Sequence, residues 1–365
     1  MSNVKPAVFT PEYRIQFDNS SLIQAIAGKS LAHPPVWLMR QAGRYLPEYQ
    51  EIRSHFPDFM SLCRSPDATT ELALQPLRRF EFDAAIVFSD ILTIADSLEM
   101  GLRFVPGEGP VLRNPITTPK QIERLPFDTC IERLDYVFTA VRHLRAALGQ
   151  RLPIIGFSGS PWTQACYMLS GYGEKNFTTA KKFAYTHPVA MTSLLERLAA
   201  LTASYLYQQY LAGADVLFVI DTWGGLLADT HFSLYSGAML QRICDHLLEM
   251  QCPAPIMFFS KGLTVSRLSP LAKIPNLCIV GLDWCADLPA MHQHFPSLTF
   301  QGNLDPAILH AGPVTTQQHT RDLLESLVDH KRYISGLGHG ILPETPADSV
   351  HALVDTVRSQ SSTRR

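Results

Sequence analysis

The stretch Pro35-Val-Trp-Leu-Met-Arg40-Gln-Ala-Gly-Arg44 is a short apolar run that ends in two arginines close to a glycine. A continuous apolar run is typical of a strand that is buried on both faces. Gly43 allows close approach of the backbone, and planar guanidinium groups bind carboxylates or phosphates through paired hydrogen bonds. The stretch therefore predicts a buried strand followed by an anion-binding turn. In the alternative interpretation, Arg40 and Arg44 lie on one solvated face of a helix.

The same pattern, a short apolar run followed by a longer amphipathic stretch, recurs along the chain. Strand–helix alternation predicts parallel strands that are joined by right-handed crossovers. Eight such runs occupy residues 35–39, 84–89, 152–157, 216–220, 255–259, 277–282, 298–301 and 332–335. Eight is the number of strands in a (β/α)8 TIM barrel, so we expect a single-domain α/β barrel. An open doubly wound sheet is the alternative.

Segments outside the eight runs predict helices, one insertion and an N-terminal arm. Apolar residues recur at helical spacing over residues 188–211, 234–250 and 316–329. Two short runs around a Pro-Gly turn, residues 102–114, predict a hairpin inserted after the second strand. We expect an N-terminal arm over residues 1–33, with one helix over 20–27 that Gly28 stops. The barrel then covers residues 34–358, and residues 359–365 form a C-terminal tail.

Composition and charge exclude several classes of protein. The chain has 365 residues, 46% of them hydrophobic, and a formal net charge of −2, so no general attraction to nucleic acid or membranes is expected. Its seven cysteines are scattered without a Cys-x-x-Cys pair, which favours reduced, mostly buried thiols. The sequence contains neither a signal peptide nor a run of about 20 apolar residues. We therefore expect a cytoplasmic protein.

Polar residues and glycines follow nearly every apolar run. In a (β/α)8 barrel, the chemistry takes place in the loops after the carboxyl ends of the strands. The segments at these positions are 40–44, 90, 156–162, 221–225, 260–262, 283–284, 301–305 and 335–340. Their common placement predicts one shared pocket.

Two of these positions carry groups that suit acid–base chemistry. Asp90 follows the second run, where the alternative role is that of a helix N-cap. His339 lies between Gly338 and Gly340, and its ordinary pKa of about 6.5 suits proton transfer or anion pairing. The alternative for His339 is a loop histidine with a backbone partner.

Several common motifs are absent. The run Gly336-Leu-Gly-His-Gly340 lacks both the Gly-Lys-Ser/Thr ending of a P-loop and the full dinucleotide-binding pattern. The segment Gly156-Phe-Ser-Gly-Ser160 does not have the glycine spacing of a nucleophile elbow. No His/Cys group has the spacing of metal ligands. Nucleotide binding, serine hydrolysis and a metal site are therefore not expected.

Six segments together resemble the uroporphyrinogen decarboxylase family. They are residues 40–49, 63–66, 88–92, 156–163, 221–225 and 338–340. The resemblance extends over roughly residues 16–355, and the first segment is highly specific to the family. It implies a cofactor-independent and metal-independent barrel enzyme, usually a homodimer, in haem biosynthesis. Such an enzyme converts the four acetate side chains of uroporphyrinogen III to methyls, giving coproporphyrinogen III and four CO2.

The resemblance also implies roles for particular residues. Asp90 matches the aspartate that accepts hydrogen bonds from the central pyrrole N–H groups. Arg40 and Arg44 match arginines that bind acetate and propionate carboxylates, and Arg40 is a candidate for proton delivery. Tyr167 matches a tyrosine close to this aspartate and to the reacting acetate. His339 matches a histidine that contacts a propionate.

Further residues are implied to line the substrate site. Thr222 occupies a position at which the family carries a hydroxyl donor. Gln41, Ala42, Gly43 and Phe59 are expected to contact the substrate, with core packing as an equal alternative for Phe59. Proton delivery by Tyr167, His339, water or the substrate stays open beside Arg40.

The chain departs from the family pattern at residues 171–176, where relatives carry a loop rich in glycine and serine. Two other functions compete with the decarboxylase. A corrinoid- or thiol-dependent methyltransferase of similar fold would need zinc and a His-x-Cys pair, which this chain lacks. A non-catalytic tetrapyrrole-binding protein would bind porphyrins without releasing CO2.

Overall fold

A curled sheet of seven parallel strands forms the centre of the molecule in the computed structural model, which describes residues 20–359. Each strand pairs with the next along the chain, so the order in the sheet follows the sequence without reversal. A doubly wound sheet reverses its strand order near the middle, so that alternative is wrong. The strands are β1 (Ala85–Ile86), β4 (Ile154–Gly159), β5 (Val216–Asp221), β6 (Ile256–Ser260), β7 (Leu277–Gly281), β8 (Thr299–Leu304) and β9 (Tyr333–Leu337).

The first predicted strand is reduced to one bridge. Only Val36 pairs with a strand, in parallel with Ser335 of β9. On its other side, the Val36 N–H donates to the Asp83 carboxylate at 2.7 Å, and the Asp83 N–H donates to the Val36 carbonyl at 2.8 Å. A buried side chain thus takes the place of a strand ladder, which explains why neither run 35–39 nor run 84–89 pairs over its full length.

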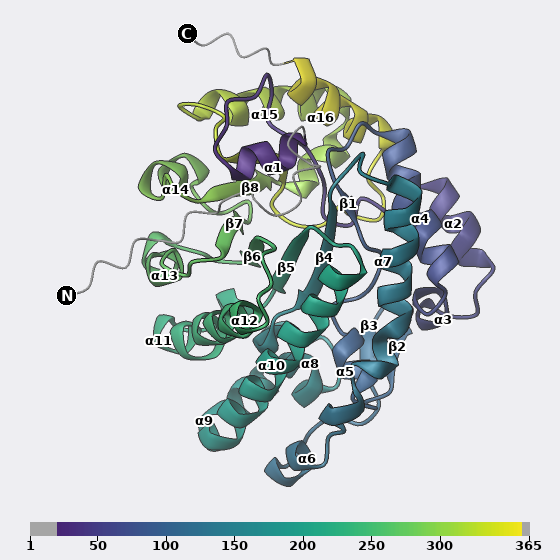
Figure 1. The fold of residues 1–365 in the computed structure, drawn as a ribbon, viewed down its shortest axis with the longest axis vertical. Coiled ribbons are helices and arrows are strands. Elements are labelled where there is room, and N and C mark those ends of the chain that lie inside the picture. Colours follow the sequence, from purple (N-terminus) through teal and green to yellow (C-terminus); the bar gives the residue numbers. More distant parts are fainter. Residues whose placement is uncertain (1–19, 360–365) are drawn as a thin grey trace.

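The burial of the strands agrees with their continuous apolar runs. Every residue of β4, β5, β6, β8 and β9 is buried. Figure 1 shows β4 to β8 side by side at the centre, with the helices arranged around them. The helices that flank the parallel strands therefore cover the outside of the sheet, as expected for α/β proteins.

The long helices begin and end at recognisable residues. The helix α10 (Pro188–Ala212) has proline at its first position and ends at Gly213, which has a φ of 127°. The pattern at 234–250 divides into a π-helical turn, Ser233–Gly237, and α12 (Ala238–Glu249). The third pattern forms α15 (Pro313–Ser326). The other long helices are α2 (Pro47–Ser54), α4 (Pro66–Arg79), α7 (Asp135–Leu148), α8 (Pro161–Ser170), α9 (Thr178–Thr186) and α16 (Ala347–Ser359).

Shorter elements connect these helices and strands. A two-stranded antiparallel sheet consists of β2 (Leu102–Val105) and β3 (Gly109–Leu112), and Tyr172 forms an isolated bridge with Val111. The first helix, α1 (Ser21–Ile26), is followed by Gly28 with a φ of 73°. The remaining short helices are α3 (Phe59–Cys63), α5 (Thr93–Ser97), α6 (Pro119–Glu123), α11 (Asp229–Phe232), α13 (Val265–Leu271) and α14 (Leu288–His294).

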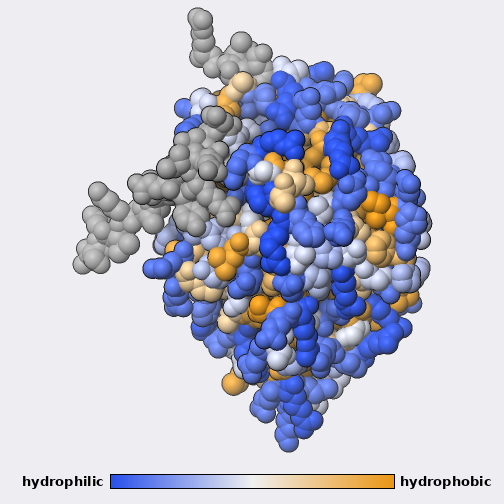
Figure 2. All heavy atoms as spheres, turned by 45° about the vertical axis from the view of Figure 1, so that its right-hand side comes forward, coloured by the Kyte–Doolittle hydropathy of each residue, from blue (hydrophilic) through white to orange (hydrophobic). Residues whose placement is uncertain are grey.

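The surface and the cysteines agree with the composition. Figure 2 shows that the face over α2, α4 and α7 is mainly hydrophilic, with small separate apolar areas. All seven cysteines are free, and five of them are buried. No helix within residues 20–359 is long and apolar enough to cross a bilayer.

Candidate active site

Arg40 and Arg44 lie in a turn and not on a helix, so the helical alternative is wrong. Both side chains are exposed, and Arg40 has the left-handed φ of 62°, which is costly for a residue with a side chain. A Cβ atom added to Gly340 would lie 2.5 Å from Arg40 Cδ. The absence of a side chain at Gly340 therefore lets Arg40 rest against the loop that carries His339. Within residues 20–359, neither arginine forms an ion pair, so both remain available to a ligand.

Asp90 is partly buried at the end of the second run, and one carboxylate oxygen accepts the Leu92 N–H at 2.8 Å. The N-cap of α5 is Leu92, so the N-cap interpretation of Asp90 is wrong. The bond is a local turn contact, and it uses one of the about four acceptor positions of a carboxylate. Burial raises the pKa of Asp90 to about 6, while the Leu92 N–H and Arg40 lower it. Asp90 is therefore ionised at neutral pH with free acceptor positions.

The raised pKa of Asp90 predicts a stability change for Asp90→Asn. Below a pH of about 4, Asp90 is protonated in both the folded and the unfolded chain. As the pH rises to about 6, only the unfolded chain loses this proton, so the folded state loses stability. We expect Asp90→Asn to increase the free energy of unfolding by on the order of 2 kcal/mol at neutral pH, and by much less near pH 4. Urea unfolding at both pH values measures the difference, and an equal effect at both would contradict it.

Tyr167 lies on α8, near Asp90 and Arg40. Its ring is buried and packs against Phe177, with centroids 5.1 Å apart, and against Trp223 at 6.5 Å. Burial raises the pKa of the Tyr167 hydroxyl to about 12; the charge of Asp90 raises it further and Arg40 lowers it. The hydroxyl therefore keeps its proton at neutral pH and can donate it in a hydrogen bond.

His339 differs from its expected state. Its ring packs edge-on against Phe259 and Trp284, with centroids 5.7 and 6.4 Å away. Burial lowers the pKa of His339 to about 3, and the charges of Arg40 and Lys261 lower it further. The ordinary pKa of about 6.5 therefore does not apply to His339 in the folded protein, and its imidazole is neutral at physiological pH. Its Nε2 atom is buried and has no hydrogen-bond partner.

Asp221 lies at the same end of the sheet, but the sequence alone assigned it no role. It is fully buried at the end of β5 and accepts hydrogen bonds from the hydroxyls of Ser160, Thr163 and Ser236 at 2.8, 2.8 and 2.5 Å. Burial raises the pKa of Asp221, and the three hydroxyls lower it. The carboxylate thus connects α8, which carries Tyr167, to the loop after β5.

Thr222 follows Asp221 directly and is partly buried. The next residue, Trp223, donates its N–H to the Thr163 hydroxyl at 3.2 Å. The Trp162 indole donates to the Trp223 carbonyl at 3.1 Å. Both backbone groups of Trp223, the N–H and the carbonyl, are therefore bonded to side chains of α8. These two bonds fix the position of the adjacent Thr222.

The other predicted contact residues have structural partners. Gln41 is buried; its side chain accepts the Leu38 N–H at 3.3 Å and donates to the Ala84 carbonyl at 3.1 Å. Its backbone is bonded as well, because the Gln41 N–H donates to the Leu38 carbonyl at 3.0 Å and the Gln41 carbonyl accepts the Tyr45 hydroxyl at 2.7 Å. Ala42 and Gly43 are partly buried in the same turn.

Phe59 packs with other aromatic rings. Its centroid lies 4.5 Å from that of Phe104 on β2 and 6.1 Å from that of Phe88, two residues before Asp90. The ring is only partly buried. The structure thus contains the packing interaction that was the alternative to substrate contact.

The segment that departs from the family pattern is an ordered connection between two helices. Gly171 ends α8 with a φ of 80°, and the Glu174 carboxylate accepts the backbone N–H of Thr179 at 3.2 Å. The Thr179 hydroxyl also donates to Glu174 at 2.5 Å. An acidic side chain at the start of α9 is favoured by the helix dipole. Glu174 therefore stabilises the first turn of α9.

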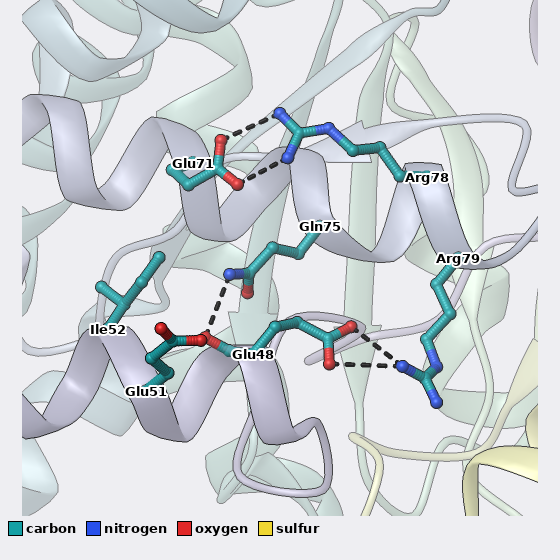
Figure 3. Close-up of a pocket in the computed structure, with 7 residues that line it drawn as sticks. All are labelled: Glu48, Glu51, Ile52, Glu71, Gln75, Arg78 and Arg79. Atoms are coloured by element: carbon teal, nitrogen blue, oxygen red, sulfur yellow. Dashed lines mark hydrogen bonds and ion pairs between the residues drawn. The ribbon is translucent and has the colours of Figure 1, made fainter.

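An open groove of about 470 Å³ lies elsewhere, between α2 and α4 on the outside of the molecule. Figure 3 shows its charged side chains directed toward one another. Arg78 pairs with Glu71 at 2.5 Å and Arg79 with Glu48 at 3.3 Å, and the Gln75 amide donates to the Glu48 carbonyl at 3.1 Å. Both arginines are thus paired with carboxylates, and Glu51 adds a further negative charge, so the groove is not the predicted anion site. No group of three or more potential metal ligands occurs within residues 20–359.

Comparisons with solved structures show the fold. A methyltransferase from Methanosarcina mazei matches with a TM-score of 0.76 and 17% sequence identity, covering 93% of this chain and 97% of its own. A B12-independent methionine synthase from Shewanella sp. matches with a TM-score of 0.53 at 13% identity, covering 91% of this chain and 97% of its own. At such low identity these likenesses concern architecture alone.

Sequence comparisons show the family. A relative from Coxiella burnetii, named uroporphyrinogen decarboxylase, is 41% identical over 95% of this chain and 96% of its own. A relative of the same name from Francisella tularensis is 42% identical over 93% of this chain and 98% of its own. The family model described as uroporphyrinogen decarboxylase (URO-D) matches residues 17–360. The chain therefore belongs to the uroporphyrinogen decarboxylase family.

Proposed function

We propose that this enzyme, a carboxy-lyase, converts uroporphyrinogen III to coproporphyrinogen III by removing CO2 from all four acetate side chains. The observation that carries this function is the family membership over nearly the whole chain. The site supports it, because Asp90 presents a carboxylate that is ionised at neutral pH near the unpaired Arg40. A polycarboxylate with central N–H donors needs both kinds of group.

The substrate itself supplies the electron sink for this reaction. Protonation of a pyrrole α-carbon makes the ring cationic, and the C–C bond to the carboxylate then breaks toward the ring. The methylene carbon takes up a proton and the α-carbon releases one. Each acetate thus consumes one proton overall and leaves a methyl group and CO2. The protein supplies positioning and electrostatic stabilisation.

The site residues divide these tasks. Asp90 accepts hydrogen bonds from the pyrrole N–H groups and stabilises the cationic ring through its negative charge. Arg40 and Arg44 bind carboxylates at the rim, and Arg40 is the candidate proton donor. Tyr167, which stays protonated, donates a hydrogen bond to the reacting acetate.

The remaining residues hold the periphery of the substrate. The Thr222 hydroxyl donates to a carboxylate, and neutral His339 contacts a propionate through Nε2. Backbone groups of Gln41, Ala42 and Gly43 line the turn beside them. For Phe59, the rings that surround it support packing as its main role.

The proposal extends to architecture and assembly. The bridge from Val36 to β9 and its bonds to Asp83 beside β1 support a single-domain barrel in which the Val36 segment completes the ring of strands. Most of the proposed N-terminal arm (residues 1–33) and C-terminal tail (359–365) lies outside the described residues. The seven free cysteines support a reducing, cytoplasmic location. The family resemblance supports a homodimer. Val189 is 82% exposed and Leu234 47%, so apolar side chains are available for such contacts.

Stepwise decarboxylation tests the proposed function. The protein is incubated without oxygen with uroporphyrinogen III, and the products are oxidised and separated by carboxylate number. We expect porphyrins with seven, six, five and four carboxyl groups to appear in turn. Unchanged substrate from a folded sample would reject the decarboxylase, and porphyrin binding without CO2 release would favour a non-catalytic binding protein.

A further inference from the structure

We propose that Lys261, supported by Trp284, binds the same substrate carboxylate as His339 and completes its subsite. Lys261 follows β6, Trp284 follows β7 and His339 follows β9, so the three side chains come from neighbouring or nearly neighbouring strand ends. The inference rests on the proposed function, because it assigns one more ligand to the same polycarboxylate. None of the predicted site residues lies after β6 or β7.

The geometry brings a cation and a ring system together at this place. Lys261 Nζ lies 4.9 Å from the centroid of the Trp284 ring, within the range of a cation–π contact. The Trp284 ring in turn contacts the His339 ring edge-on, with centroids 6.4 Å apart. Lys261 is partly buried and Trp284 is 40% exposed, so the group is accessible to a ligand.

The loops that carry Lys261 and Trp284 are fixed to each other by a buried carboxylate. Asp283 accepts the backbone N–H of Gly262, the residue after Lys261. It also accepts the Cys285 N–H, one residue beyond Trp284, at 2.7 Å. Because Asp283 is satisfied by backbone donors, it holds the two loops without neutralising the ammonium group through an ion pair.

Within residues 20–359, the cations of this region form no ion pair. Arg40 and Lys261 both act on His339, and within the described residues neither cation forms an ion pair with a carboxylate. The Nε2 atom of His339 is buried and without a partner. A carboxylate bound here would accept a hydrogen bond from the unpartnered ring nitrogen and would balance the charge of the two cations.

The position of Lys261 complements that of Arg44. In the order of the sheet, β6 is separated from the Val36 segment by β1, β4 and β5 on one side and by β7, β8 and β9 on the other. Lys261 therefore follows the middle strand of the seven, whereas Arg44 follows the segment that bridges to the edge strand β9. A macrocycle with carboxylates around its whole edge offers a partner to each of these cations.

Kinetics of Lys261→Gln test the inference, with Lys273→Gln as the matched control. Lys273 is an exposed lysine of the same loop–helix unit, located after α13 and away from the strand ends. We expect Lys261→Gln to raise KM for uroporphyrinogen III about tenfold, which corresponds to about 1.4 kcal/mol, with kcat within about twofold of the native value. Lys261→Arg should restore most of the affinity. A KM equal to that of Lys273→Gln, or a loss in kcat alone, would overturn the inference.

A substrate series distinguishes the two possible sources of the carboxylate. Propionates persist through all rounds, whereas acetates disappear. An equal rise in KM for the substrates with eight and five carboxyl groups assigns the subsite to a propionate, and a smaller rise for the second assigns it to an acetate.

Binding of oxidised uroporphyrin, followed by quenching of tryptophan fluorescence, separates this inference from the proposed function. If the native protein binds the porphyrin but releases no CO2 from uroporphyrinogen, the function fails. The ratio of Kd values for Lys261→Gln and Lys273→Gln still decides the role of Lys261. A ratio near one overturns it.

Discussion

Asp90→Ala is expected to lower kcat for uroporphyrinogen III by about 10²–10⁴-fold, the largest effect among the site residues. Each hydrogen bond from a pyrrole N–H to the carboxylate contributes about 1.5–3 kcal/mol, and the variant loses two or more of them. The negative charge that stabilises the cationic ring is lost as well. Anaerobic release of CO2, measured with saturating substrate, gives kcat directly.

Asp90→Asn separates charge from shape. The amide keeps one acceptor oxygen, so the Leu92 N–H contact can persist, but its NH2 group faces N–H donors of the substrate. We expect most of the turnover to be lost while the fold becomes more stable. Asp67→Asn, at an exposed carboxylate on α4, is the control and should keep native activity. Full activity of Asp90→Asn would show that the carboxylate does not act electrostatically.

The strands and their polar ends could be predicted from the sequence, because continuous apolar runs mark buried parallel strands and the loops follow from topology. The extent of the first strand could not. Asp83, which precedes the second run, takes the Val36 N–H, and no periodicity reveals that a side chain replaces a ladder. The turn at Arg40 depends similarly on Gly340, some three hundred residues later in the chain.

The proximity of the candidate site residues was easier to predict than their protonation. Arg40 interacts electrostatically with Asp90, Tyr167 and His339. This proximity follows from the topology, because the loops after parallel strands meet at one end of the sheet. The neutral state of His339 depends on neighbours from other strands, so its local sequence could not reveal it.

The role of Asp221 was missed for a related reason. Its three hydroxyl donors are Thr163 on α8, Ser160 at the N-cap of α8, and Ser236 in the π-helical turn. Ser160 and Thr163 belong to the segment 156–163, and Asp221 begins the segment 221–225. Both segments are visible in the sequence, but only the fold joins them into one hydrogen-bonded unit.

Asp221→Ala is expected to lower the free energy of unfolding by about 3 kcal/mol. The substitution leaves three buried hydroxyls and the Gly224 N–H without their acceptor, and each unsatisfied donor costs about 1–3 kcal/mol. Relief of the buried charge offsets part of this cost, because burial raises the pKa of Asp221. Asp221→Asn keeps the oxygen that Ser160 and Thr163 share and should cost about 1 kcal/mol. Urea unfolding at neutral pH measures both.

The control and a double variant decide whether hydrogen bonding is the cause. Asp322→Ala removes an exposed carboxylate on α15 that accepts one amide, so its effect should be close to zero. Ser236→Ala in the background of Asp221→Ala removes one stranded donor along with its acceptor. Because a missing pair costs less than an unsatisfied partner, the second substitution should be nearly neutral or stabilising there but destabilising alone. Additive losses would mean that Asp221 stabilises the loop after β5 by packing. In that case, the change in activation free energy from kcat in Asp221→Ala would not exceed the change in the free energy of unfolding.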